Sequence, residues 1–106
     1  MSAAFDIRRE LISWDGVETA PHRFGGIEFR VGGHELGHLH GDRVADLPFP
    51  RGMREELLAA GKACPHDIVP ESGWVSVPIG AAGDVPMVIE LFRLSYDRAR
   101  RAACTG

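Results

Sequence analysis

Hydrophobic and polar residues alternate on both sides of a glycine pair near the middle of the chain. Residues 26–31 read Gly-Ile-Glu-Phe-Arg-Val, an alternation with a period of two that is typical of a half-buried strand. Gly32-Gly33 suits a two-residue hairpin turn, which needs positive φ at both positions. The pattern therefore predicts an antiparallel hairpin whose second strand covers residues 34–40.

The register of this hairpin decides which side chains share a face. Counting outward from the turn pairs Phe29 with Leu36 and Ile27 with His38. Because successive side chains of a strand point to opposite faces, His40 lies on the same face as His38. We therefore predict that both histidines lie on the apolar face of the hairpin, which packs against the rest of the protein.

Outside the hairpin, the pattern predicts helices near the ends of the chain and strands between them. Helices are predicted near residues 3–13, from Pro50 to about Ala60 and after Asp84, with further strands over residues 17–20, 44–49 and 74–79. Pro48 confines its strand to an edge or an end, and residues 64–73 are predicted to be a loop. The order α-β-β-β-(β)-α-β-α is typical of an α+β fold, in which helices pack on one face of an antiparallel sheet.

The composition is that of one ordinary soluble domain spanning residues 1–106. The formal net charge of −3 disfavours binding to nucleic acid or to an anionic membrane. No apolar run approaches the ~20 residues of a membrane helix, and the N-terminus lacks the pattern of a secretory signal. Two cysteines, Cys64 and Cys104, do not make a disulfide framework, so we expect a reduced, cytoplasmic setting. Arginine far outnumbers lysine, which we attribute to a GC-rich bacterial genome.

Two histidines in the second strand of the hairpin are the first candidates for chemistry. His38 and His40 are two residues apart and therefore point to the same side of a strand. With His66, from the predicted loop, they make a workable ligand set for zinc or iron, with Asp42 or Glu71 as a carboxylate. The same residues suit a pocket for a non-metal ligand, in which a histidine moves protons near neutral pH. The third interpretation is structural, with core histidines hydrogen-bonded to backbone or carboxylate groups.

Trp74 begins the strand that follows the loop containing His66, and two roles are open for it. It serves either as a core anchor or as a flat surface for a ligand. We predict that His38, His40 and His66 converge on one cavity beside Trp74, because two of them face the core by register and the third precedes the strand of Trp74. Cys64 lies near His66, but nothing in the sequence indicates an activated thiolate.

Four segments of the chain resemble the luciferase-like domain family, which joins small uncharacterised bacterial proteins to the luciferase of bioluminescent fungi. They lie within residues 24–97 and are His-Leu-His-Gly-Asp at 38–42, Leu-Pro-Phe-Pro at 47–50, Pro-His-Asp-Ile-Val-Pro-Glu-Ser-Gly-Trp-Val-Ser at 65–76 and a final helix ending near Ser95-Tyr96. The chain is similar to the small bacterial members over most of this length. The similarity to the fungal enzyme is more distant and depends on the two histidines of the hairpin, a later histidine, an aromatic strand start and the final helix.

The resemblance implies a function for the histidines. The fungal enzymes are understood to oxygenate a hydroxylated pyrone with O2 and without an obvious cofactor. Carried over, this places His38, His40 and His66 around a small aromatic ligand as catalytic residues, one of them the general base, with no metal; zinc or iron held by the same three residues is the alternative. The remaining ligand-binding residues are expected to be Asp42, Glu71 and Trp74. The loop around His66 differs from that of the fungal enzyme, so the resemblance implies a shared pocket and not light emission.

A second, looser similarity concerns the small MmcQ/YjbR-like domains, which share the order of elements and have been discussed as DNA binders. The first hypothesis is therefore a small-molecule-binding protein, in the form of a cofactor-independent oxygenase that acts on a small aromatic or pyrone-type compound. The alternative is a noncatalytic interaction or nucleic-acid-binding module, which the net charge disfavours. We expect the ligand pocket on the helix-covered face of the sheet; the sequence does not set the oligomeric state.

Overall fold

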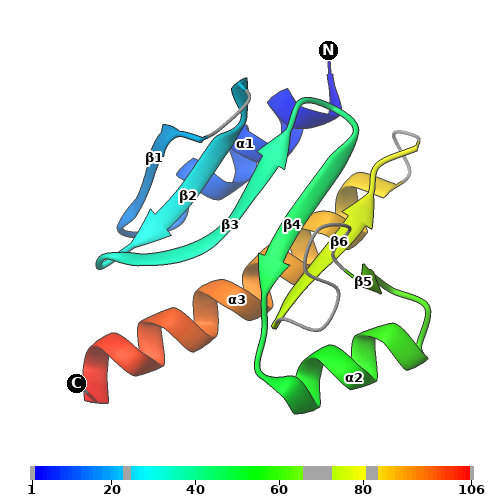
Figure 1. Cartoon of the computed structure of the whole chain (residues 1–106). Helices are drawn as coiled ribbons and strands as arrows, with labels where there is room; N and C mark the ends of the chain where they lie inside the picture. The colour runs from blue at the N-terminus through cyan, green and yellow to red at the C-terminus, as the bar shows by residue number, and fades with distance from the viewer. Residues whose placement is uncertain (1, 23–24, 66–72, 81–83, 106) are drawn as a thin grey trace.

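The structure, a computed structural model, describes residues 2–22, 25–65, 73–80 and 84–105 (Figure 1). One antiparallel sheet has the strand order β1-β2-β3-β4-β6-β5. The strands are β1 (Val17–Pro21), β2 (Ile27–Val31), β3 (His34–His40), β4 (Val44–Pro48), β5 (Cys64–Pro65) and β6 (Trp74–Pro78), and the helices are α1 (Ala3–Ile12), α2 (Arg51–Ala59) and α3 (Val85–Thr105). The predicted α+β class and order of elements are confirmed.

Helices α1 and α3 lie against each other and cover one face of the sheet (Figure 1). The ring of Phe92 on α3 meets the ring of Phe29 on β2 edge-on, with 5.5 Å between the ring centroids. Burying a side chain of this kind stabilises the fold by about 1.5–3 kcal/mol. The core on this face also includes Ile7, Leu11, Leu39, Leu47, Val75, Val88 and Leu91. In the described part of the chain, no helix is long and apolar enough to cross a membrane.

Local signals place the ends of the elements as predicted. The side chain of Ser2 caps α1 by accepting a hydrogen bond from the backbone N–H of Phe5 at 3.1 Å. Gly32 and Gly33 have φ of 56° and 83°, so the hairpin turn uses the positive φ that two adjacent glycines allow. Gly61, with φ of 72°, follows the end of α2.

Beyond the first two residue pairs from the turn, the hairpin register shifts by one residue. Phe29 pairs with Gly37, where the sequence analysis paired it with Leu36, so Leu36 is the extra residue of a β-bulge on β3. A side chain at position 37 is excluded by close packing. A Cβ there would lie 2.7 Å from the backbone oxygen of Asp46 and 2.9 Å from the ring of Phe92.

The bulge moves the two histidines of β3 to the other face of the sheet. His38 pairs with Glu28, and His40 follows two residues later on the same face. The prediction that both histidines share the apolar face with Ile27 and Phe29 is therefore wrong. The expectation of a histidine pocket on the helix-covered face is wrong for the same reason, because one extra residue reverses every later side chain of the strand.

Two smaller features refine the predicted strands. Cys64–Pro65 forms the two-residue strand β5, where the sequence predicted only a loop. Residues 66–72 of that loop lie outside the described residues. Pro48 is the last residue of β4, which pairs with β3 on one side and β6 on the other. The proline therefore ends a central strand, one of the two places that its missing N–H allowed.

Candidate functional site on the polar face of the sheet

A row of polar side chains crosses the face of the sheet opposite α1 and α3. Glu28 pairs with His38 between β2 and β3, and His38 pairs with Asp46 between β3 and β4. Asp46 in turn pairs with Ser76 between β4 and β6. Directly paired residues point to the same face of a sheet. Adjacent strands thus present a glutamate, a histidine, an aspartate and a serine side by side.

Asp46 is the centre of a hydrogen-bond network on this face, although it is only 5% exposed. The hydroxyl of Ser76 donates to Asp46 Oδ1 at 2.6 Å, and His38 Nε2 donates to Oδ2 at 3.1 Å. His40 Nε2 lies 3.2 Å from the same Oδ2. A buried carboxylate is tolerated when donors surround it. Ser76 and His38 supply hydrogen bonds, and the His40 ring lies close by.

His38 lies between two carboxylates. Its Nε2 faces Asp46, and its Nδ1 donates to Glu35 Oε2 at 2.9 Å. In a regular strand, Glu35 and His38 would point to opposite faces because they are three residues apart. The bulge at Leu36 removes that difference and brings both side chains to the polar face. Since carboxylates accept and do not donate, this geometry favours a ring with a proton on each nitrogen, the imidazolium.

The environment raises the pKa of His38 above the ordinary value of 6.5. Burial is the largest single influence and acts the other way, because a charged ring is poorly solvated inside the protein. The hydrogen bonds to Asp46 and then to Glu35, with the charges of both carboxylates, outweigh burial. His38 therefore keeps its proton to a higher pH than an ordinary histidine does.

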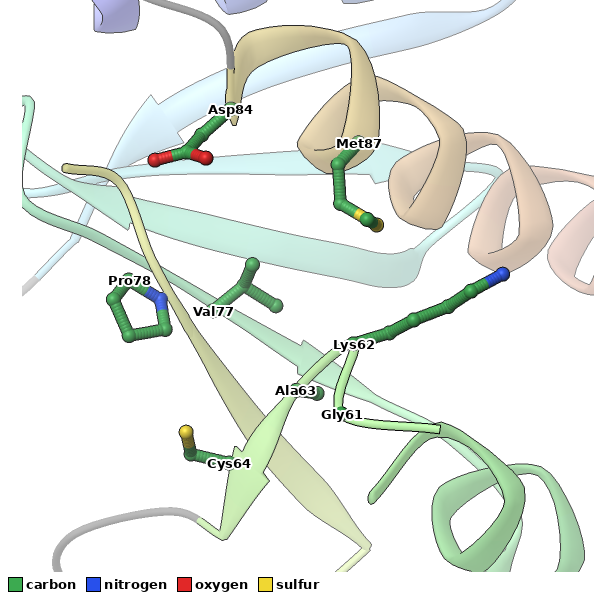
Figure 2. A pocket seen from close by; sticks show the side chains of 8 residues that line it. All are labelled: Gly61, Lys62, Ala63, Cys64, Val77, Pro78, Asp84 and Met87. Carbon is green, nitrogen blue, oxygen red and sulfur yellow. The ribbon is translucent and has the colours of Figure 1, made fainter. Parts of the chain in front are cut away.

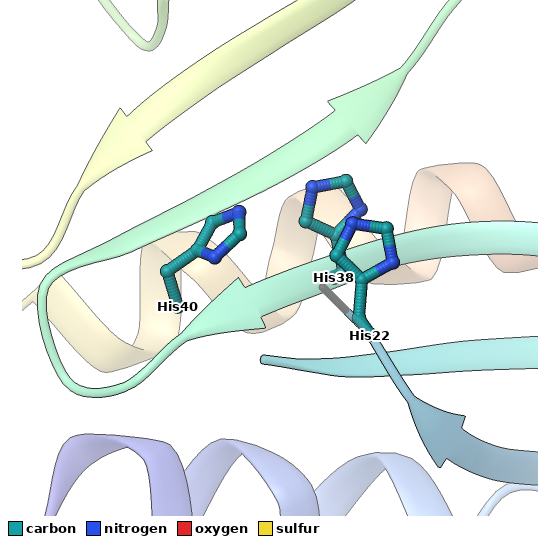
Figure 3. A group of neighbouring side chains, drawn as sticks. All are labelled: His22, His38 and His40. Atoms are coloured by element: carbon teal, nitrogen blue, oxygen red, sulfur yellow. The ribbon is translucent and has the colours of Figure 1, made fainter. Parts of the chain in front are cut away.

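His22, just after β1, completes a group of three imidazoles with His38 and His40 (Figure 3). Its ring stacks on the ring of His38, with 3.8 Å between centroids and 18° between planes. Its Nδ1 lies 3.1 Å from Glu28 Oε1, and the other oxygen of Glu28 accepts from Arg30 Nε. These bonds, first that of His22 and then that of Arg30, lower the pKa of Glu28. His22 and His40 are partly exposed, so the group opens to solvent.

The three imidazoles are close enough to bind one metal ion. One ring nitrogen from each of His22, His38 and His40 lies within 4.8 Å of the other two. The predicted metal alternative named His66 in place of His22, and His66 lies outside the described residues. The predicted set of His38, His40 and His66 therefore stays untested. In the structure, His38 and His40 lie together with His22.

The other predicted site residues are Trp74, Asp42 and Glu71, and the two that the structure describes have different positions relative to the cluster. Trp74 lies at the polar face, with its ring centroid 5.1 Å from that of His38. Asp42 lies in the turn after β3, and its Oδ1 accepts a hydrogen bond from the backbone N–H of Ala4 at 2.7 Å, near the start of α1. Glu71, like His66, lies outside the described residues. The structure thus brings together His38, His40 and Trp74, and it engages Asp42 with the N-terminal end of a helix.

Several members of this cluster were not among the predicted site residues: His22, Glu28, Glu35, Asp46 and Ser76. One signal was present, because Asp46 interrupts the apolar strand over residues 44–49 and a carboxylate there needs partners. His22 carried no such signal. It reaches the cluster only because β1 pairs with β2, which pairs with β3.

A separate cavity of about 290 Å³ lies near the end of α2 and the start of α3 (Figure 2). Lys62, Cys64 and Asp84 contribute its polar groups, and Asp84 Oδ2 accepts a hydrogen bond from the backbone N–H of Gly80. Its apolar wall includes Val77 and Met87. Among the described residues, neither a predicted site residue nor a histidine lines this cavity.

Comparison with known protein families matches residues 33–95 to the Luciferase domain. The match covers more than half of the chain and contains His38, His40, Asp46, Trp74 and Ser76. It begins after His22 and Glu28. No curated protein and no solved structure matches the chain.

Proposed function

The chain belongs to the Luciferase domain family, and we propose that it binds a small aromatic or pyrone-type compound on the polar face of its sheet. The proposed activity is that of an oxygenase that uses no cofactor, and light emission is not part of it. The observation that carries the proposal is the network centred on Asp46, which joins a buried histidine and a solvent-accessible histidine to one carboxylate.

His40 is the proposed general base. Its Nε2 lies 3.2 Å from Asp46 Oδ2, so the carboxylate favours the tautomer with the proton on Nε2. Among the described residues, no partner occupies its Nδ1. That nitrogen therefore keeps a lone pair for a substrate proton, and the partial exposure of His40 gives a substrate access.

His38 and Trp74 supply the binding surface in this proposal. The His38 imidazolium, held by Glu35 and Asp46, places positive charge beneath the site. That charge favours an anion above it, such as a deprotonated hydroxyl of a phenol or pyrone. Trp74, with its ring centroid 5.1 Å from that of His38, offers an aromatic surface for the ligand ring.

The proposed reaction needs only the organic substrate and O2. His40 Nδ1 takes the proton of the substrate hydroxyl, and the resulting anion gives an electron pair to O2. A carbon–oxygen bond forms, O2 is reduced to a bound peroxide anion, and the His40 imidazolium returns the proton to give a hydroperoxide. The substrate is oxidised by two electrons and O2 is reduced by two, so no further oxidant is needed.

Oxygen uptake with a panel of hydroxylated α-pyrones and phenols tests the proposal. We expect uptake by the unmodified protein and a loss of about 100-fold or more in His40→Gln, the size of a missing general base. His34→Gln is the matched control, because His34 lies on the same strand and is exposed. Equal rates for the protein and His40→Gln, or no binding of any panel member in calorimetry, would contradict the proposal.

Small-molecule binding is better supported than nucleic-acid binding on this face. Three carboxylates, those of Glu28, Glu35 and Asp46, surround the histidines. Phosphate groups bind where Lys and Arg neutralise them, and carboxylates repel them. We therefore expect no shift of duplex DNA at physiological salt, and a salt-sensitive, submicromolar shift would favour the nucleic-acid hypothesis instead.

A further inference from the structure

We propose that His22, His38 and His40 form a binding site for one divalent first-row transition metal ion, such as Zn²⁺. This inference goes beyond the proposed function and does not rest on it. It differs from the sequence-based metal hypothesis in its third ligand, His22, which directly follows β1 and lies next to the buried histidine of β3 (Figure 3).

The spacing of the imidazoles is close to that of a formed site. Zn²⁺ binds histidine nitrogens at about 2.0–2.1 Å, so two nitrogens of a tetrahedral site are roughly 3.4 Å apart. One ring nitrogen from each of the three histidines lies within 4.8 Å of those from the other two. The rings of His22 and His38 are stacked, so their lone pairs lie in nearly parallel planes. Metal binding therefore requires the partly exposed rings of His22 and His40 to turn until their lone pairs converge with that of the buried His38.

Each histidine of the group already has a carboxylate on one ring nitrogen. Glu28 lies on Nδ1 of His22, Glu35 on Nδ1 of His38 and Asp46 on Nε2 of His40. Histidines that bind metals commonly donate their second ring N–H to a carboxylate, which fixes the tautomer and makes the other nitrogen a better ligand. The cluster shows this second set of contacts for all three rings.

The contacts assign the nitrogens that would face the metal. Among the described residues, Nε2 of His22 and Nδ1 of His40 have no partner, so both are available as they stand. His38 Nε2 becomes available when it gives up Asp46 Oδ2, an oxygen that it shares with His40. Asp46 then keeps the hydroxyl of Ser76 and the nearby ring of His40. The hydrogen bond between His38 and Asp46 is exchanged for one coordinate bond, and the proton on His38 Nε2 leaves to solvent.

The donor set indicates the class of metal. Imidazole nitrogen suits Zn²⁺, Cu²⁺, Ni²⁺ and iron, whereas Mg²⁺ and Ca²⁺ prefer oxygen ligands. Three protein ligands with a solvent-facing side resemble catalytic sites, in which a fourth position stays open. The nearby carboxylates offset the added charge. A bound metal would occupy His40 Nδ1, so metal binding and the base role of His40 exclude each other.

Calorimetric titration of the chelator-treated protein with Zn²⁺ alone tests the site, and Co²⁺ is the spectroscopic probe. We expect one Zn²⁺ per chain and visible absorption bands of nitrogen-ligated Co²⁺. His22→Phe keeps an aromatic ring stacked on His38 and removes the nitrogens. It should weaken Zn²⁺ binding by more than about tenfold, because even outer contacts of a metal site change affinity by about 10–100-fold.

His34→Phe is the matched control, since it removes an exposed histidine of β3 outside the group. It should bind Zn²⁺ as the unmodified protein does, and circular dichroism must show that each variant is folded. Absence of one-to-one binding, an unchanged affinity in folded His22→Phe, or an equal loss in His34→Phe would overturn the proposal. No organic ligand is present in this titration, so its result tests the metal site alone. The oxygenase proposal is tested separately by oxygen uptake.

Discussion

The two faces of one sheet differ in what holds their side chains in place. On the face covered by α1 and α3, apolar side chains such as Phe29, Leu47 and Val75 are fully buried. These side chains are held mainly by close packing against their neighbours. On the other face, His38 and Asp46 are nearly as buried, yet each is held by polar partners. The same strands thus carry a packed core on one side and a charged network on the other.

This contrast separates the side chains that stabilise the fold from those that are available for chemistry. Buried polar groups are costly unless every partner is present, so a network of this size is not needed to hold a sheet that already has a complete apolar core. The contrast predicts large losses of stability for changes on the helix-covered face and smaller losses for changes on the polar face, where function is expected to fail first.

The largest expected effect is that of Phe92→Ala. Phe92 is fully buried and packs edge-on against Phe29, so its removal leaves a cavity beneath the sheet. We expect a loss of about 3–5 kcal/mol in the free energy of unfolding, measured by urea denaturation. A loss below about 1 kcal/mol would mean that the helix-covered face is not the main core.

Gly37→Ala should have the next largest effect and tests the bulge. The added methyl group would meet the backbone of Asp46 and the ring of Phe92 at distances that real contacts do not reach. We expect a loss of about 3 kcal/mol, at the upper end of the range for overpacking. Gly52→Ala is the control, because nothing lies within 4 Å of a Cβ at that helical position. Equal stabilities of the two variants would contradict the bulge geometry.

Asp46→Asn should destabilise the protein less, by about 1–2 kcal/mol. The amide keeps the shape of the carboxylate but accepts fewer hydrogen bonds from Ser76 and His38, and it removes the negative charge that faces His40. Asp97→Asn is the matched control, since Asp97 is exposed and forms a surface ion pair with Arg93. Chemical denaturation of both variants measures the difference, and a larger loss in Asp97→Asn would reverse the ranking of the two carboxylates.

The smallest expected effect is the pH dependence caused by His38. Its pKa in the folded protein is raised above 6.5, so protonation favours the folded state. The resulting stabilisation is fully present below about pH 6.5 and is lost as the pH rises through the folded pKa. Urea midpoints of the metal-free protein between about pH 6 and pH 8.5 should fall with rising pH, less so in His38→Gln. A rise in stability over this range that disappears in His38→Gln would contradict the direction of the shift.

Most of the fold follows from patterns that are local in sequence. The Gly32-Gly33 turn, the Ser2 cap and the alternation of residues 26–31 depend on neighbouring residues, and the structure has all three. The bulge at Leu36 was missed because alternation alone does not show an extra residue, although a glycine inside a strand, Gly37, is a common sign of one.

The candidate site was less predictable because it depends on pairing between strands. His38, His40 and Trp74 were predicted correctly as neighbours. The predicted face of the two histidines was wrong, because one residue of register decides the face. His22 could not be found from spacing, because only the pairing of strands brings it to His38. The grouping of side chains on this face therefore follows from the register and not from the motif alone.

The two tryptophans allow the most direct test, because they report on opposite sides of the molecule. Trp74 lies beside His38 on the polar face, whereas the indole N–H of Trp14 donates to Glu10 and its ring packs near Tyr96 of α3. In a ¹H–¹⁵N spectrum of the protein titrated with a hydroxylated pyrone, the indole signal of Trp74 should shift and that of Trp14 should stay in place. A shift of the Trp14 signal alone, or of neither signal, would contradict a ligand site on the polar face.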